Sequence, residues 1–260
     1  MLRSLMCCAV IGFIAILSAT SSSFGGTVFL DDFNKSNQPL VGTTPNTGGV
    51  WTNVSSTSNP IQIVSNAVVM GAAGGEDALS LTDGIVPTTP ANVIHTGLDI
   101  NVSSATATGD YFAHLGDGST TAFYQRLFAK SSGAGYVLGL VDTSGTGSTI
   151  TYGSTVLTFG TSNHVDINWT AVAGNNNDTF ALLVNTLPYL VHTWTSATVE
   201  PAFIKSAHLR QGGATTSAAL TVDNYTVDAP VVVPEPATIM LLGIVGVAGL
   251  GCRRVNRCPR

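Results

Sequence analysis

Residues 93–102 read Val-Ile-His-Thr-Gly-Leu-Asp-Ile-Asn-Val, and apolar side chains occupy most of the even positions while His95, Asp99 and Asn101 occupy odd ones. Successive side chains of an extended chain point to opposite faces. This alternation therefore predicts a β-strand with one face buried and the other in water. Including Asn92, we expect the strand to span residues 92–102.

Many other segments share this pattern, being short and rich in Val, Ile, Thr and aromatic residues. Turn signals such as Asp117-Gly118 and Ser132-Gly133 separate several of them. The further predicted strands are Thr27–Phe33, Gly49–Asn53, Ile61–Val64, Ala67–Met70, Asp110–Leu115, Ala122–Ala129, Gly135–Val141, Thr155–Phe159, Val165–Ala173, Thr179–Asn185, Ala202–Leu209 and Ala218–Val227. So many short strands predict an all-β fold, with two sheets packed as a sandwich over residues 26–229.

The composition supports this fold and narrows the function. Charged residues make up 10% of the 260 residues, and Lys occurs only three times, which does not favour helices. Residues 26–229 hold five basic and 14 acidic residues, a net charge of −9. Such a surface repels nucleic acid and attracts divalent cations. None of the four cysteines lies between residues 9 and 251, so this domain has no internal disulfide.

The N-terminal 25 residues have the features of a secretory signal peptide. Arg3 precedes an apolar run over residues 5–17, and small residues follow up to Gly26. An uncleaved anchor helix is the alternative, but the run is shorter than the roughly 20 residues that span a membrane. We expect a signal helix that directs the chain to the Sec translocon.

The C-terminal residues 230–260 have the features of a membrane anchor. A proline-rich segment leads into the uncharged residues 237–251, which predict a single transmembrane helix, and an arginine cluster closes the chain. Arginines remain on the cytoplasmic side, which places the preceding domain outside the cell. The apolar run is short for a span, which suits an anchor that is held briefly and then removed.

This end of the chain resembles the PEP-CTERM sorting signal. The resemblance rests on Pro234, Glu235 and Pro236, the apolar run that follows, and Arg253-Arg254. It implies recognition and processing near the triplet by an exosortase, an integral-membrane enzyme. An ordinary single-span anchor is the alternative. The resemblance also implies an association with exopolysaccharide, biofilm or floc material.

The middle of the chain resembles the concanavalin A-like and laminin-G-like jelly rolls. The residues that carry this resemblance are Asp31-Asp32-Phe33 near its start, residues 111–117, 126–128 and 138–140, and Leu220–Tyr225 near its end. The resemblance implies a jelly-roll sandwich whose first and last strands lie side by side.

Three carboxylates are candidates for a structural Ca²⁺ site. If the first and last strands pair, Asp31, Asp32 and Asp223 come close together, and oxygen ligands suit Ca²⁺. The alternative is that these side chains bond to nearby backbone at the strand ends.

Trp194 is the candidate for sugar stacking. It alternates with polar residues in His192-Thr193-Trp194-Thr195, which suggests an exposed position, although single aromatic residues in a sandwich more often belong to the core.

No catalytic residues are expected. Glycosidases generally need two facing carboxylates, and Glu76, Glu200 and Glu235 lie far apart without such a motif. The five histidines are scattered singly, and the chain has no Gly-x-Ser-x-Gly motif. We therefore expect a non-enzymatic surface or matrix protein. The alternatives are a carbohydrate-binding module and, less favoured, a polysaccharide hydrolase or lyase.

The expected processing gives a direct test. Mass spectrometry of the exported protein should find its C-terminus near residues 234–237, with both apolar ends removed. A mature chain that still ends at Arg260 would contradict processing at the Pro-Glu-Pro triplet.

Overall fold

The computed structural model describes residues 26–55, 60–71, 76–85, 92–143, 147–172, 176–197, 200–212 and 218–228. The expected signal peptide (1–25) and sorting segment (230–260) lie outside these residues. Within the described part of the chain, all regular structure is β-strand, as predicted. No helix in that part is long and apolar enough to cross a membrane.

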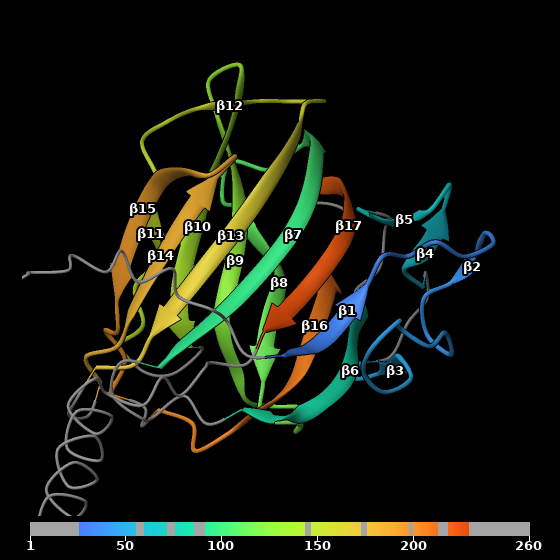
Figure 1. Ribbon diagram of the computed structural model, residues 1–260. Coiled ribbons are helices and arrows are strands. Elements are labelled where there is room, and N and C mark those ends of the chain that lie inside the picture. The colour runs from blue at the N-terminus through green and yellow to red at the C-terminus, as the bar shows by residue number, and fades with distance from the viewer. Residues whose placement is uncertain are drawn as a thin grey trace, which may run out of the picture.

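The strands form two antiparallel sheets that pack face to face (Figure 1). The first sheet has nine strands: β15 (Leu187–Thr193), β14 (Thr179–Val184), β13 (Ser162–Thr170), β7 (Val93–Ser104), β17 (Ala219–Asp228), β5 (Ala67–Met70), β4 (Gln62–Val64) and β2 (Gln38–Pro39) in order, with β1 (Thr27–Asp31) also paired to β17. The second sheet has eight strands: β11 (Thr151–Tyr152), β10 (Gly135–Thr143), β9 (Phe123–Ser132), β8 (Asp110–Gly116), β16 (Ile204–Gln211), β6 (Glu76–Ile85) and β3 (Thr52–Asn53) in order, with β12 (Leu157–Thr158) paired to β10.

The first and last strands pair, as the jelly-roll resemblance implied. Thr27 lies opposite Asp228 and Asp31 opposite Tyr225 in the antiparallel β1–β17 ladder. On its other side β17 pairs with β7, so it lies in the middle of the first sheet (Figure 1). The described domain therefore begins and ends at one place.

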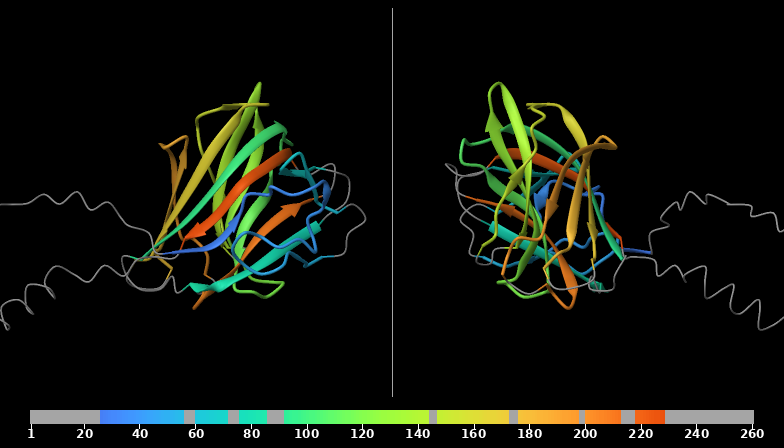
Figure 2. Two further views of the ribbon diagram at one scale, coloured as in Figure 1. Left: turned by 45° about the vertical axis from the view of Figure 1, so that its right-hand side comes forward. Right: turned by 90° about the vertical axis from the view of Figure 1, so that its left-hand side faces the viewer.

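Residues 93–102 confirm the predicted alternation. Ile94, Leu98, Ile100 and Val102 are buried in the core between the sheets. The intervening polar residues, such as Asp99, are on the outer face of the first sheet, where they line a pocket or remain partly exposed. The two layers are seen edge-on in Figure 2.

Four strands were not predicted. They are β2, β6, β11 and β15, and the two longest contain residues that disfavour strands. Asp83 and Gly84 lie within β6, and Pro188 lies within β15. Pro188 is tolerated because β15 is at an edge of its sheet, where one row of backbone N–H groups needs no partner strand.

Aromatic rings fill one end of the core. Trp169, Trp194 and Phe180 pack together, with ring centroids 5.0–6.1 Å apart, and Tyr124 lies 6.4 Å from Trp194. Trp194 is 4% exposed, so the prediction that it is an exposed sugar-stacking residue is wrong. The segment does alternate, but in the opposite phase: His192 and Trp194 point inward, while Val191 is exposed.

The buried polar neighbour explains the wrong phase. His192 is two residues before Trp194, so the two side chains lie on the same side of the extended chain. A polar residue on that side suggests that the side faces water. In the structure His192 is 1% exposed, and its Nδ1 lies 2.8 Å from the Thr151 hydroxyl of the second sheet. This hydrogen bond satisfies one nitrogen of the buried ring, and the other, Nε2, lies 3.8 Å from the Asp142 carboxylate.

Trp194 should accordingly matter for stability. Truncating it to alanine removes a buried ring, and we expect Trp194→Ala to lower the free energy of unfolding by about 3–5 kcal/mol. Chemical denaturation of the purified protein measures this change. As the control, Leu187→Ala removes a side chain that is 68% exposed and should change stability by less than about 1 kcal/mol. Equal stability of the two variants would contradict the assignment of Trp194 to the core.

Candidate functional site

The outer face of the second sheet carries a group of basic and aromatic side chains. In β9, Leu127 and Ala129 point into the core, so by alternation Arg126, Phe128 and Lys130 point away from it. The neighbouring strands β8 and β16 add Tyr111 and Arg210 to the same face. We call Asp110, Tyr111, Arg126, Lys130 and Arg210 the arginine–tyrosine cluster.

Tyr111 is at the centre of this cluster. The guanidinium carbon of Arg210 lies 4.1 Å from the centroid of the Tyr111 ring, and that of Arg126 lies 5.0 Å from it. Cations at such distances are attracted by the ring electrons. The Phe128 ring is 5.6 Å from Tyr111 and extends the aromatic surface.

Hydrogen bonds hold the two guanidinium groups in place. Arg210 donates from Nη1 to Asp110 Oδ1 at 2.8 Å and to the Tyr111 carbonyl at 3.4 Å. Arg126 donates from Nη2 to the Thr143 carbonyl at 2.7 Å. Burial lowers the pKa of Arg126 and the nearby Arg210 charge adds to this effect, while Tyr111 and Asp142 oppose it. The Arg126 guanidinium nevertheless stays protonated at neutral pH.

Tyr152 adjoins the cluster through its contact with Lys130. The ammonium group of Lys130 lies 4.9 Å from the centroid of the Tyr152 ring. Burial raises the pKa of Tyr152 and the Asp110 carboxylate raises it further, so the phenol is neutral at physiological pH. The Tyr152 hydroxyl has no hydrogen-bond partner among the described residues.

Two stacked histidines adjoin the cluster. The His114 and His208 rings lie 4.1 Å apart, both are at most 1% exposed, and Tyr111 packs on His114 at 5.5 Å. Ser206 Oγ lies 2.8 Å from His208 Nε2. These buried rings support Tyr111 from beneath and are not exposed to a ligand.

The cluster was not identified from the sequence. Arg126 and Tyr111 were noted only as parts of the jelly-roll resemblance, and Arg210 was not noted at all. One signal was available: residues 26–229 contain only five basic residues, namely Lys35, Arg126, Lys130, Lys205 and Arg210. The structure brings three of the five to one face.

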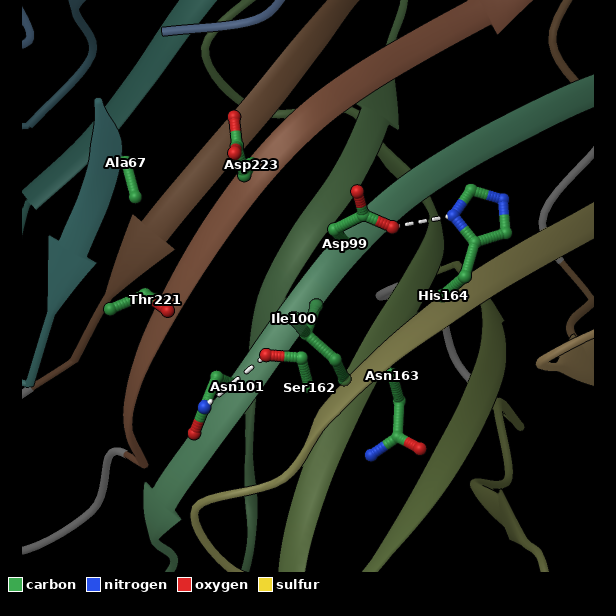
Figure 3. Close-up of a pocket in the computed structure, with 9 residues that line it drawn as sticks. All are labelled: Ala67, Asp99, Ile100, Asn101, Ser162, Asn163, His164, Thr221 and Asp223. Atoms are coloured by element: carbon green, nitrogen blue, oxygen red, sulfur yellow. Dashed lines mark hydrogen bonds and ion pairs between the residues drawn. The ribbon is translucent and has the colours of Figure 1, made fainter. Parts of the chain in front are cut away.

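A second polar site lies on the outer face of the first sheet (Figure 3). It is a shallow pocket of about 380 Å³, and its lining includes Asp99, Asn101, Ser162, His164 and Asp223. Asp99 Oδ1 is 2.6 Å from His164 Nδ1, and Asn101 donates to Ser162 Oγ at 3.4 Å. Two pairs of polar groups that line the pocket, Asp99 with His164 and Asn101 with Ser162, thus bond to each other.

The pocket continues into a chain of alternating carboxylates and imidazoles. His164 Nε2 is 3.1 Å from Asp166 Oδ1, which in turn is 2.8 Å from His95 Nε2. His95 Nδ1 is 3.0 Å from Asp228 Oδ2. We call Asp99, His164, Asp166, His95 and Asp228 the His–Asp chain; it connects β7, β13 and β17 across the sheet.

The His–Asp chain favours charged imidazoles. Burial by itself would lower the pKa of His95, but bonds and charges from Asp166 and Asp228 outweigh it and raise the pKa to about 9. The same balance raises the pKa of His164, where Asp99 and Asp166 are the partners. The hydrogen bond from His95 lowers the pKa of both Asp166 and Asp228.

The three predicted calcium ligands have other partners. Asp31 is fully buried, accepts hydrogen bonds from Trp51 Nε1 at 2.8 Å and Phe33 N at 2.9 Å, and pairs with the Lys35 ammonium group. Asp32 accepts hydrogen bonds from the Asn34 backbone and the Asn46 side chain.

Asp223, the third candidate, accepts a hydrogen bond from the Asn224 backbone N–H at 2.8 Å. Burial raises its pKa, and the charges of Asp99, Asp32 and Asp31 raise it further. Among the described residues, no three His, Cys, Asp or Glu side chains are grouped so as to hold a metal ion. Asp32 and Asp223 thus make the local backbone hydrogen bonds that the alternative expects, and calcium binding stays a prediction from the sequence.

The C-terminal residues decide how the protein is sorted. Residues 232–255 match the PEP-CTERM protein-sorting motif. The motif marks the chain as an exported surface protein that an exosortase processes after transient anchoring in the membrane. It contains Pro234, Glu235, Pro236, Arg253 and Arg254, which lie outside the described residues.

Solved structures resemble the sandwich domain of this PEP-CTERM protein at low identity. One is the CBM2 module of the evolved Dit protein of Lactobacillus casei BL23 phage J-1, with 13% identity, a TM-score of 0.49, and coverage of 80% of this chain and 96% of the module. Another is an endo-1,3-β-glucanase from Streptomyces sioyaensis, with 15% identity, a TM-score of 0.48, and coverage of 80% and 98%.

A third is an endo-β-1,4-glucuronan lyase from the fungus Trichoderma reesei, with 10% identity, a TM-score of 0.46, and coverage of 78% and 96%. At such values the likeness identifies no ligand or activity. No curated protein matches the sequence.

The His–Asp chain predicts how stability depends on pH. Because the folded-state pKa of His95 is raised from 6.5 to about 9, its contribution is fully present below pH 6.5 and is lost as the pH rises through 9. This loss should be on the order of 3 kcal/mol, by the conversion of pKa shift to free energy. Urea denaturation at pH 6 and at pH 9.5 measures it.

Two variants separate this effect from general alkaline unfolding. His95→Gln should remove most of the stability difference between the two pH values. His164→Gln, at an imidazole that is 45% exposed, should remove less of it. If His95→Gln kept the full pH dependence, the assignment to His95 would be wrong.

Proposed function

We propose that the mature protein is a non-enzymatic, adhesive component of the cell surface or extracellular matrix that binds exopolysaccharide through the arginine–tyrosine cluster. Sec-dependent export and final residence in a biofilm complete this proposal. The sandwich serves as a rigid support. Residues 26–229 contain no cysteine, so the buried core rather than a disulfide holds the two sheets together. The observation that carries the proposal is the half-buried Tyr111 ring, with two guanidinium groups 4.1 and 5.0 Å from its centroid.

Such an arrangement suits a sugar chain. Pyranose rings present C–H groups that pack on aromatic faces, and hydroxyl groups that bond to charged donors. The donors on this face are attached to paired strands rather than to loops. Their positions are therefore set before binding, which lowers the entropy cost of recognition.

The same geometry supports binding without hydrolysis. Glycoside hydrolysis generally uses two carboxyl groups, one of which must change its protonation state. Asp110 is the carboxylate of the cluster, and it is paired with Arg210 at 2.8 Å. The cluster thus offers one carboxylate, where such hydrolysis uses a pair.

Two substitutions at Tyr111 test the proposal. Tyr111→Leu removes the ring, and we expect the dissociation constant for the polysaccharide from the producing cells to rise at least tenfold. Tyr111→Phe keeps the ring and should change affinity by less than about threefold. Affinity electrophoresis or calorimetry with the mature protein measures both, and thermal melting verifies that each variant folds.

Phe203→Ala provides the control, because Phe203 is an exposed aromatic residue (45%) outside the cluster. It should bind like the unaltered protein. If Tyr111→Leu bound equally well, the cluster would not be the binding surface. Release of new reducing ends or unsaturated sugars by the mature protein would contradict the non-enzymatic role.

A further inference from the structure

We infer that the ligand of the arginine–tyrosine cluster is an anionic polysaccharide, whose carboxylate or sulfate groups bind Arg126, Arg210 and Lys130. This inference rests on the proposed function and names its ligand class. The structural basis is the convergence of three cations from two strands on one face, with Asp110 as the cluster's carboxylate.

The concentration of positive charge is unusual for this domain. Residues 26–229 carry 14 acidic and five basic residues, so most of the surface repels anions. The cluster as defined has three positive charges against the Asp110 carboxylate. Around it, Asp142 acts on Arg126, and Asp77 lies opposite Arg210 in the β6–β16 ladder. An anionic chain would therefore meet attraction on this face and repulsion elsewhere, which confines it to the cluster.

The remaining two basic residues show that the convergence is specific. Lys35 pairs with the buried Asp31 and has a structural role next to Trp51. Lys205 is exposed and lies 5.1 Å from the Phe203 ring, outside the cluster. Neither residue adds to the positive face that surrounds Tyr111.

The two arginines are positioned to bind an anion. Arg210 donates from Nη1 to Asp110 and to the Tyr111 carbonyl, and its side chain is still 26% exposed. A guanidinium group carries five N–H donors in a planar fork that matches carboxylate and sulfate oxygens. Arg126 and Arg210 both lie against the Tyr111 ring and the charge of Arg210 acts on Arg126, so an anion bound beside the ring would offset this repulsion.

The test uses ligands that differ in charge alone. We expect the mature protein to bind polygalacturonate at least tenfold more tightly than its fully methyl-esterified form, and dextran sulfate more tightly than dextran. The first pair probes carboxylates and the second probes sulfates. Raising the salt from 20 to 500 mM should weaken binding to the charged polymers, because screening acts on exposed charges.

Variants assign the effect to the cluster. Arg210→Gln should weaken binding to the preferred anionic polymer at least tenfold. Arg210→Lys keeps the charge but loses the planar fork, so its affinity should lie between those of the unaltered protein and Arg210→Gln. Arg126→Gln should act in the same direction, with melting curves to verify folding, since Arg126 also bonds to Thr143. Lys205→Gln removes one positive charge outside the cluster and should leave binding unchanged.

The outcomes distinguish this inference from the proposed function. Suppose that charged and neutral polymers bound equally well to the unaltered protein and lost affinity equally in Tyr111→Leu. That result would overturn the inference that the ligand is anionic, but would keep polysaccharide binding at this face. Equal losses in Arg210→Gln and Lys205→Gln would show that net charge rather than the cluster attracts the ligand, and would also overturn it. Absence of binding to any polysaccharide, including that of the producing cells, would overturn the proposed function itself.

Discussion

Antiparallel pairing of the last strand, β17, with three other strands holds the first sheet together. It pairs with β7 along one side and with β1 and β5 along the other, so the N-terminal part of the chain joins the sheet only through β17. Without a disulfide in residues 26–229, this ladder and the core beneath it must keep the sandwich closed. Because Thr27 and Asp228 are opposite each other, residues 1–25 and the segment with the sorting motif are joined to the same end of the domain.

The alternation of side chains in a strand then determines what each sheet can present. A strand that buries its apolar residues against the other sheet must display the intervening residues on its outer face. In a chain with 10% charged residues, those outer positions are among the few places for ionisable groups. They are used differently on the two sheets, since the first displays paired imidazoles and carboxylates and the second displays cations around an aromatic ring.

These two faces have different physical roles. In the His–Asp chain each charge has an opposite partner at 2.6–3.1 Å, so the chain mainly ties strands together. In the arginine–tyrosine cluster the cations outnumber the carboxylate, and part of the charge faces solvent. The sandwich therefore places a charge-paired face and a face with an excess of cations on opposite sides of its core.

Most of the strands and the all-β class could be predicted from the sequence, because alternation and turn residues act within a few neighbouring positions. The Val93–Ser104 strand is the plainest case, whereas the polar and proline-containing β6 and β15 were missed because their pairing partners stabilise them. The sorting motif was likewise readable, since exosortase substrates are marked by a linear pattern. Alternation alone did not determine whether Trp194 faces the core or the solvent, because the hydrogen-bond partner that lets His192 be buried on the same side is Thr151 of a distant strand.

The sequence by itself determined the fold class, most of the strands and the sorting motif, all of which depend on patterns local in the chain. Only the tertiary structure decided which side chains meet. Asp110 and Arg210 are 100 residues apart, and His95 and Asp228 are 133 residues apart, yet each pair is in hydrogen-bond contact. The physical reason is that a strand's own residues set its two faces, while the pairing of strands across the sheet sets their neighbours.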